Sequence, residues 1–174
     1  LVFRGIPYAT VERFVPPVPV PPWAGELEAT AFGPIAPQAA GAQFQRPDLE
    51  QHEQCLSPNV WTPATDPRGD GTSRPVMVWI HGGAFVTGTS MGAFGGDTEG
   101  TEFAKKGVIV VGVNHRLGRA GWFAHPALAK EPGLTGNYGN MDQIAGLKWV
   151  KANIAAFGGD PGNVTAVGKS AEAM

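Results

Sequence analysis

The sequence predicts an open α/β fold with a mostly parallel central sheet. The first observation is two short, continuous apolar runs, at 76–80 and 108–113, with a third segment, 163–167, that is also interpreted as a buried strand. Such runs are typical of strands buried on both faces of a parallel sheet. The second observation is that helical patterns separate them, so that the order is strand, helix, strand, helix, strand. The 174 residues suffice for one domain with a sizeable core.

The N-terminal segment is expected to be extended. Leu1–Ala9 is interpreted as a short strand that Pro7 ends or confines to a sheet edge. Five prolines between positions 16 and 22 then favour an extended path up to Trp23. We favour packing over a proline-rich binding motif, because the apolar residues Phe14, Val15, Val18 and Trp23 interleave with the prolines. A further strand is predicted at Cys55–Trp61.

Two helices are predicted in the second half. The first is a short helix over Thr98–Lys106, and the segment Arg116–Gly139 that comes later is expected to be a long loop. The second helix is expected to begin at an Asn140 N-cap, with Gln143 completing a capping box. Its core-facing stripe is predicted from apolar residues at spacings of three and four, namely Ile144, Leu147, Val150, Ile154 and Phe157.

Composition limits the classes of partner. The net charge of −2 gives no electrostatic reason to expect nucleic acid or an anionic membrane. No apolar run approaches the roughly 20 residues of a membrane span. Cys55 is the only cysteine, so an internal disulfide is impossible. The sequence begins at Leu1 and leaves open both a leader peptide and the compartment, cytoplasmic or secreted.

Ser170 is the candidate nucleophile. It follows the predicted strand 163–167 and stands in Gly168-Lys169-Ser170-Ala171, where small neighbours allow a sharp turn into a helix. Such a turn projects a serine hydroxyl away from the backbone, toward a base that can take its proton. The alternative is an ordinary helix N-cap serine. From the local sequence alone the two interpretations are equally supported.

The second candidate feature is the segment His81-Gly82-Gly83-Ala84, which directly follows the strand 76–80. Glycines at this place can turn their N–H groups toward an open site. Two N–H groups of this segment, together with the N–H of Ala171, would stabilise a tetrahedral oxyanion. The alternative is a plain Gly-Gly turn. Because both features follow apolar strands in one chain, we favour an acyl-transfer site.

Other functions are less well supported. Gly168-Lys169-Ser170 resembles the end of a phosphate-binding loop, but Asn163 stands where that motif needs its first glycine. The spacing of His52 and Cys55 is typical of two metal ligands, but the sequence has no second pair of ligands at such a spacing. No metal site and no cofactor are therefore expected. No histidine is a good candidate for the catalytic base. His81 is expected instead to shape the adjoining glycine loop.

Taken together, these motifs resemble type B carboxylesterases, the α/β-hydrolases that include cholinesterases and bacterial para-nitrobenzyl esterases. The matching blocks run nearly end to end and in family order. They include Phe3–Ala9, Ala29–Pro34, Asn59–Trp61, Val76–Phe85, Asn114–Gly118 and Asn153–Asp160. The resemblance implies the α/β-hydrolase fold, with helices on both faces of the sheet. It also implies that residues 1–174 form the N-terminal portion of a single domain that is cut just after the serine turn.

The resemblance implies hydrolysis of small carboxylic esters through an acyl-serine intermediate. Ser170 matches the nucleophile, and Gly83, Ala84 and Ala171 match the oxyanion donors. It further implies two structural ion pairs, Arg13 with Glu53 and Arg116 with Asp160. The catalytic acid and histidine of the family lie beyond position 174, so these 174 residues alone are expected to be inactive.

Four positions depart from the family pattern. Lys169 stands where a glutamate usually precedes the nucleophile, and Glu172 stands in place of a glycine. A cation next to the serine would disfavour the imidazolium that forms during catalysis. Ala36 replaces a cysteine that would pair with Cys55, and His115 replaces a tyrosine. Lys169 and Glu172 keep an alternative open, namely an impaired esterase or a non-catalytic binding or adhesion domain.

Overall fold

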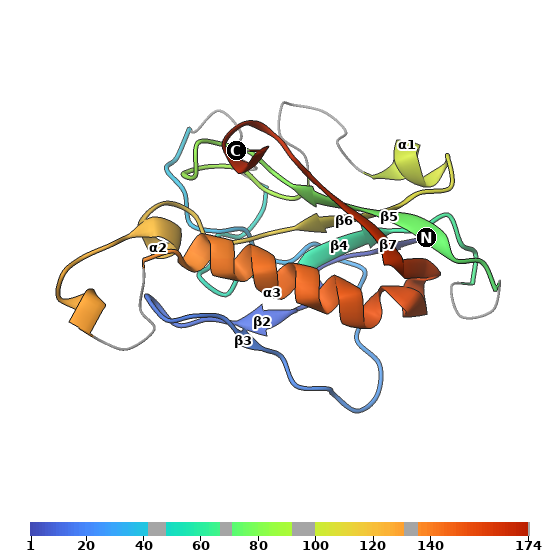
Figure 1. Cartoon of the computed structure of the whole chain (residues 1–174), viewed down its shortest axis with the longest axis horizontal. Coiled ribbons are helices and arrows are strands. Elements are labelled where there is room, and N and C mark those ends of the chain that lie inside the picture. Colours follow the sequence, from blue (N-terminus) through green and yellow to red (C-terminus); the bar gives the residue numbers. More distant parts are fainter. Residues whose placement is uncertain (42–47, 67–70, 92–99, 131–135, 174) are drawn as a thin grey trace.

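The central feature is a five-stranded mixed sheet (Figure 1). The computed structural model describes residues 1–41, 48–66, 71–91, 100–130 and 136–173. The strand order is β1-β4-β6-β5-β7. The strands are β1 Val2–Phe3, β4 Pro58–Trp61, β6 Ile109–Val113, β5 Arg74–Ile80 and β7 Gly159–Gly168. β5 pairs in parallel with both β6 and β7, while β4 is antiparallel to β6 and to β1. The three predicted apolar strands are therefore neighbours, as expected.

Burial differs among these three strands. All five residues of β6 are buried, and β5 alternates between buried and half-buried residues from Val76 to Ile80. The strand β7 is mostly exposed or half-buried, so its prediction as a fully buried strand was wrong. The reason is its position: in the described chain β7 pairs with β5 only and lies at an edge of the sheet.

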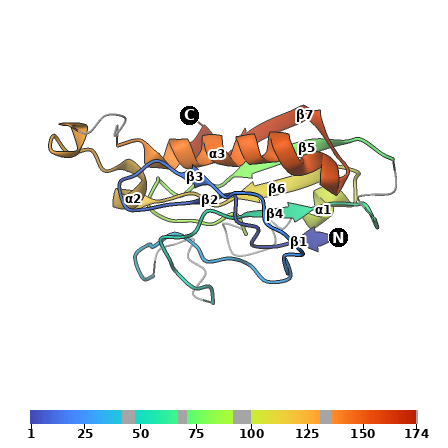
Figure 2. The ribbon, with the colours of Figure 1, turned by 90° about the horizontal axis from the view of Figure 1, so that it is seen from below.

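Two apolar clusters cover opposite faces of the sheet, as the alternation of side chains along a strand requires. The larger contains Val76 and Val78 of β5, Val111 of β6, and Val150 and Ile154, which lie at the C-terminal end of the long helix. The smaller contains Trp61, Val110 and Ala104, the last from the short helix α1, Thr101–Ala104. Figure 2 shows the long helix lying along one side of the sheet.

The long helix, α3, spans Tyr138–Asn153 and continues as the 3₁₀ turn η2, Ile154–Phe157. It begins two residues before the predicted Asn140 N-cap, and Asn137 caps it without a side-chain bond. Its most buried positions recur every fourth residue: Tyr138, Asp142, Gly146 and Val150. Ile144 is 51% exposed, so its place in the predicted core stripe was wrong. The buried face carries an aspartate and a glycine, which apolar periodicity does not detect.

The remaining elements are short. Ala9–Thr10 (β2) and Val18–Pro19 (β3) form a separate antiparallel pair beside α3 (Figures 1 and 2). The expected loop 116–139 contains the helix α2, Gly118–Trp122, and the 3₁₀ turn η1, Leu128–Lys130. The predicted helix 98–106 is described only from residue 100. Across the described ranges, no helix is both long and apolar enough to cross a bilayer.

Candidate active site at the ends of strands β5 and β7

The two motifs singled out in the sequence leave the sheet side by side. Ile80, the last residue of β5, pairs with Gly168, the last residue of β7, and the two strands are parallel. The segments that follow the two strands therefore start side by side, at the carboxyl ends of the parallel strands. These segments are His81–Gly83 and Lys169–Ser170. In open α/β sheets, ligands bind at the carboxyl ends of the strands.

Ser170 adopts a left-handed backbone conformation, with φ +58°, and is exposed. It begins a four-residue 3₁₀ turn, η3, Ser170–Ala173. A left-handed backbone costs a non-glycine residue about 1–2 kcal/mol, and such strain clusters at functional sites. An ordinary N-cap residue has an extended backbone instead. The geometry therefore favours the sharp turn that presents the hydroxyl over the simple N-cap.

Gly82 brings the two segments into contact. A Cβ atom added to Gly82 would lie 2.5 Å from the carbonyl oxygen of Lys169 and 2.9 Å from Cβ of Ser170. Both distances are shorter than a real Cβ contact allows. Only glycine leaves room for this approach, so the glycine after His81 is required by packing against the serine turn.

The glycine loop, residues 81–88, is fixed by hydrogen bonds to its own carbonyl groups. Gly83, Ala84 and Phe85 have φ values of +135°, +53° and +63°. The carbonyl of Gly83 accepts bonds from the N–H groups of Val86 (3.0 Å) and Thr87 (3.1 Å). A trans peptide is planar, so its C=O and N–H point in opposite directions. The N–H of Ala84 therefore points away from the Val86–Thr87 turn.

The three candidate donors make no internal hydrogen bond. Within the described residues, no hydrogen bond uses the N–H of Gly83, Ala84 or Ala171. Ala84 is exposed, whereas Gly83 and Ala171 are buried. Buried backbone N–H groups are rarely left without an acceptor. An arrangement that leaves such donors beside an exposed serine can accept a negatively charged oxygen from a ligand.

His81 lies beneath the loop and orients it. Its ring is 1% exposed and stacks on His115 at 4.5 Å between centroids. Its Nδ1 lies 3.0 Å from the carbonyl oxygen of Gly82 and must carry the proton, since a carbonyl only accepts. By the same planarity, the N–H of Gly83 points away from His81. Burial, and then His115, lower the pKa of His81 to about 3, so the ring is neutral. This agrees with a role in shaping the loop.

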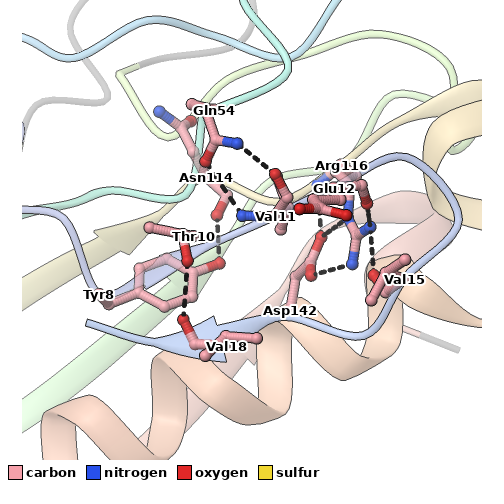
Figure 3. A network of polar contacts seen from close by, with 10 residues as sticks. All are labelled: Tyr8, Thr10, Val11, Glu12, Val15, Val18, Gln54, Asn114, Arg116 and Asp142. Carbon is pink, nitrogen blue, oxygen red and sulfur yellow. Dashed lines mark hydrogen bonds and ion pairs between the residues drawn. The ribbon is translucent and has the colours of Figure 1, made fainter. Parts of the chain in front are cut away.

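A buried ion pair anchors the adjoining segment after β6 (Figure 3). The Arg116 guanidinium donates to Asp142 through Nε (2.8 Å) and Nη2 (2.7 Å), and both side chains are almost fully buried. Its Nη1 also donates to the carbonyls of Glu12 (3.2 Å) and Val15 (2.8 Å). The predicted pairing of Arg116 with Asp160 was wrong, because the sequence did not reveal that α3 turns Asp142 toward this loop.

The other predicted ion pair is present. Arg13 donates to Glu53 through Nε (2.9 Å) and Nη2, and both side chains are at least partly exposed. The Asp160 carboxylate instead accepts from the N–H of Gly162 at 2.7 Å within β7. A hollow of about 630 Å³ lies between the N-terminal segment and α3. None of its lining residues belongs to the glycine loop or the serine turn, so it is separate from the candidate site.

Comparisons with known proteins match the whole chain. The model of the carboxylesterase family matches residues 1–174. The chain is 41% identical to a fumonisin B1 esterase of Sphingopyxis macrogoltabida, over 98% of the chain and 32% of that protein. It is 44% identical to the para-nitrobenzyl esterase of Bacillus subtilis, over 99% of the chain and 35% of that protein.

Solved structures agree with this match. A carboxylesterase from Geobacillus stearothermophilus superposes with a TM-score of 0.82 at 41% identity, covering 98% of the chain and 34% of that structure. A para-nitrobenzyl esterase structure gives a TM-score of 0.81 at 42% identity, covering 98% and 34%. The expected α/β-hydrolase fold is thereby confirmed. The chain spans about a third of the length of these relatives.

Proposed function

The chain belongs to the carboxylesterase family, and we propose that the protein containing it hydrolyses carboxylic esters with Ser170 as the nucleophile. The observation that carries this proposal is the contact of Gly82 with the Ser170 turn. At that contact an exposed serine in a left-handed turn lies next to a loop whose Gly83 and Ala84 N–H groups have no hydrogen bond within the described residues. This arrangement suits acyl transfer.

In this proposal the Ser170 oxygen attacks the ester carbonyl carbon and loses its proton to a base. The carbonyl oxygen becomes an oxyanion, which accepts hydrogen bonds from the N–H groups of Gly83, Ala84 and Ala171. Collapse of the tetrahedral intermediate breaks the bond to the alcohol, which leaves with a proton. Water then attacks the acyl-serine by the same route and releases the acid. The resemblance implies a histidine as this base, assisted by an acidic residue.

The substrate class that we propose is a small ester with an apolar acyl or alcohol part. Aromatic side chains lie around the glycine loop: the rings of Phe85 and Trp122 are 4.9 Å apart, and Trp122 meets His115 edge to face. Such side chains exclude water from the reacting groups. The relatives named above are esterases, which disfavours the alternative of a binding or adhesion domain.

The test uses the full-length protein with a short-chain para-nitrophenyl ester and a fluorophosphonate probe. Ser170→Ala is expected to abolish both turnover and covalent labelling. Ser73→Ala is the matched control, because Ser73 is also exposed but precedes β5 at the other end of the strand. Turnover or labelling that persists in Ser170→Ala contradicts the proposal. A folded wild-type protein that neither turns over esters nor reacts with the probe favours the binding alternative.

A further inference from the structure

The orientation of the Ala84 N–H depends on the residues that follow it in the glycine loop. The Gly83 carbonyl belongs to the same peptide group as this N–H and is held by the N–H groups of Val86 and Thr87. A shift of Thr87 would therefore rotate the peptide and move the donor. The contacts that hold Thr87 in place therefore help to set the direction of the Ala84 N–H.

Thr87 and Gly88 are held by a single side chain from a distant segment. The Gln38 Oε1 accepts from Thr87 Oγ1 at 2.7 Å and from the Gly88 N–H at 2.9 Å. The Gln38 Nε2 donates to the Gly88 carbonyl at 3.1 Å. A primary amide offers both an acceptor and donors, so one glutamine satisfies three groups of the loop at once.

Gln38 is itself fixed, so it can serve as an anchor. Its Nε2 also donates to the carbonyl of Ala36 at 3.1 Å, and its backbone N–H donates to the Gln51 side chain at 2.8 Å. Its segment continues from Ile35, which is fully buried and bonded through its backbone to Glu50 and His52. The side chain thus connects a buried, hydrogen-bonded part of the fold to the loop.

Gly88 extends this connection to the second donor. A Cβ atom added to Gly88 would lie 2.5 Å from both the Gly82 carbonyl oxygen and the His81 Nδ1. Gly88 therefore packs against the hydrogen bond that orients the Gly83 N–H. Through Thr87 and Gly88, Gln38 supports both peptide groups whose N–H groups are proposed to bind the oxyanion.

We propose that Gln38 is a positioning residue of the oxyanion site, acting through Thr87 and Gly88. The proposal rests on the proposed ester hydrolysis and adds a residue that lies outside both motifs. Among the described residues, Gln38 makes no hydrogen bond to Ser170 or to the Gly83, Ala84 and Ala171 N–H groups. Its effect is expected in the transition state, where the oxyanion forms, and not in the binding of the uncharged ester.

The experiment compares Gln38→Met with Gln54→Met in the full-length protein. Gln54 is a matched control because its amide also bonds both the N–H and the carbonyl of one residue, Val11, away from the loop. In Gln38→Met, kcat is expected to fall about tenfold, because small misplacements of catalytic groups have large effects on rate. KM should stay within about twofold of wild type. Gln54→Met should leave both constants unchanged.

A second pair of variants distinguishes positioning from general destabilisation. Thr87→Val removes one of the bonds to Gln38 and is expected to lower kcat by about threefold, as expected for loss of one hydrogen bond among several. The double variant Gln38→Met with Thr87→Val should be no slower than Gln38→Met alone, since both changes act through the same contact. The proposal is overturned if the two changes lower kcat additively in the double variant. It is also overturned if Gln38→Met lowers kcat no more than Gln54→Met does.

Amide hydrogen exchange provides a readout that does not depend on activity. Gln38→Met should accelerate exchange in the peptide that spans residues 81–90, while Gln54→Met should not. Unchanged exchange in that peptide overturns the proposed role of Gln38, whether or not the protein hydrolyses esters. Failure of this proposal can therefore be distinguished from failure of the proposed ester hydrolysis. If Gln38→Met does not fold, Gln38→Glu and Thr87→Val decide the matter by the same readouts. Gln38→Glu keeps the acceptor and loses the donor to Gly88.

Discussion

The loops that leave β5 and β6 are neighbours, yet they use their polar groups differently. After β6, Asn114 accepts from Ser90 N (2.8 Å) and Tyr8 Oη (2.7 Å), and Arg116 makes five bonds to Asp142, Glu12 and Val15. After β5, two consecutive N–H groups, of Gly83 and Ala84, have no bond within the described chain. The loop after β6 bonds separate segments of the fold together, while the loop after β5 holds the N–H donors that we propose for the oxyanion.

The contrast separates stability from chemistry. Changes after β6 should mainly lower the free energy of unfolding, and changes after β5 or β7, apart from the buried His81, should mainly alter the rate of catalysis. Both groups of residues lie at the carboxyl ends of parallel strands in one sheet. Mutations in the two groups can therefore show whether stability and catalysis are divided in this way.

The largest effect is expected from Arg116→Met, which leaves Asp142 as a buried and uncompensated charge. Breaking a buried pair in this way costs about 3–5 kcal/mol. Arg13→Met is the control, since its pair with Glu53 is largely exposed and such pairs contribute roughly 0–1 kcal/mol. The measurement is urea denaturation of the full-length proteins. Equal losses in both variants would show that the segment after β6 does not anchor the fold.

Gly82→Ala should reduce catalysis more than stability. The added methyl group meets the Lys169 carbonyl and Ser170, so the loop and the turn must separate. A displacement approaching 1 Å can lower kcat/KM by about a hundredfold. Gly25→Ala provides a control for catalysis, since nothing lies within 4 Å of its added Cβ atom; the strain at its φ of +84° should lower stability and leave kcat/KM unchanged. Steady-state kinetics that show wild-type activity in Gly82→Ala would remove the proposed contact between the two motifs.

The buried His81 predicts an acid-sensitive stability. Its pKa is lowered to about 3 by burial and by His115, whereas an unfolded histidine titrates near about 6.5. The unfolded state therefore binds an extra proton between these two values. This contribution to stability is complete above about pH 6.5 and declines as pH falls, by up to roughly 1.4 kcal/mol per pH unit.

The measurement compares the wild type with His81→Asn by denaturation between pH 4 and pH 7. Asparagine can still donate to the Gly82 carbonyl but does not titrate in this range. The wild type should lose stability more steeply than the variant as pH falls. Parallel pH profiles would mean that His81 is protonated equally well in the folded state.

The smallest effect is expected from the residues beside Ser170. We expect Lys169 to oppose the positive charge that would form on the proposed catalytic base. Glu172 stands where the family pattern has a glycine. Lys169→Glu together with Glu172→Gly should raise kcat/KM by about tenfold, which corresponds to roughly 1.4 kcal/mol. Lys148→Glu on the exposed side of α3 repeats the charge reversal of Lys169→Glu away from the serine turn. A double variant that is no faster than wild type would show that this protein uses Lys169 productively.

The sequence predicted the strands and the two motifs because these depend on short-range patterns. Apolar runs marked β5 and β6, and the glycines and the serine directly follow strands. It failed where partners lie far apart in the chain. The sequence predicted Asp160 as the partner of Arg116, and nothing local pointed to Asp142, because that contact depends on the rotation of α3 about its axis. No local pattern links Gln38 to Thr87, 49 positions away, or His81 to His115.

The central claim is that the loop after β5 and the turn after β7 form one acyl-transfer site. A crystal structure of the full-length protein with a phosphonate bound to its reactive serine tests this most directly. We predict a covalent bond to Ser170 Oγ and one phosphonyl oxygen about 2.7–3.1 Å from the N–H nitrogens of Gly83, Ala84 and Ala171. An adduct on another residue, or a phosphonyl oxygen directed away from the glycine loop, would contradict the account.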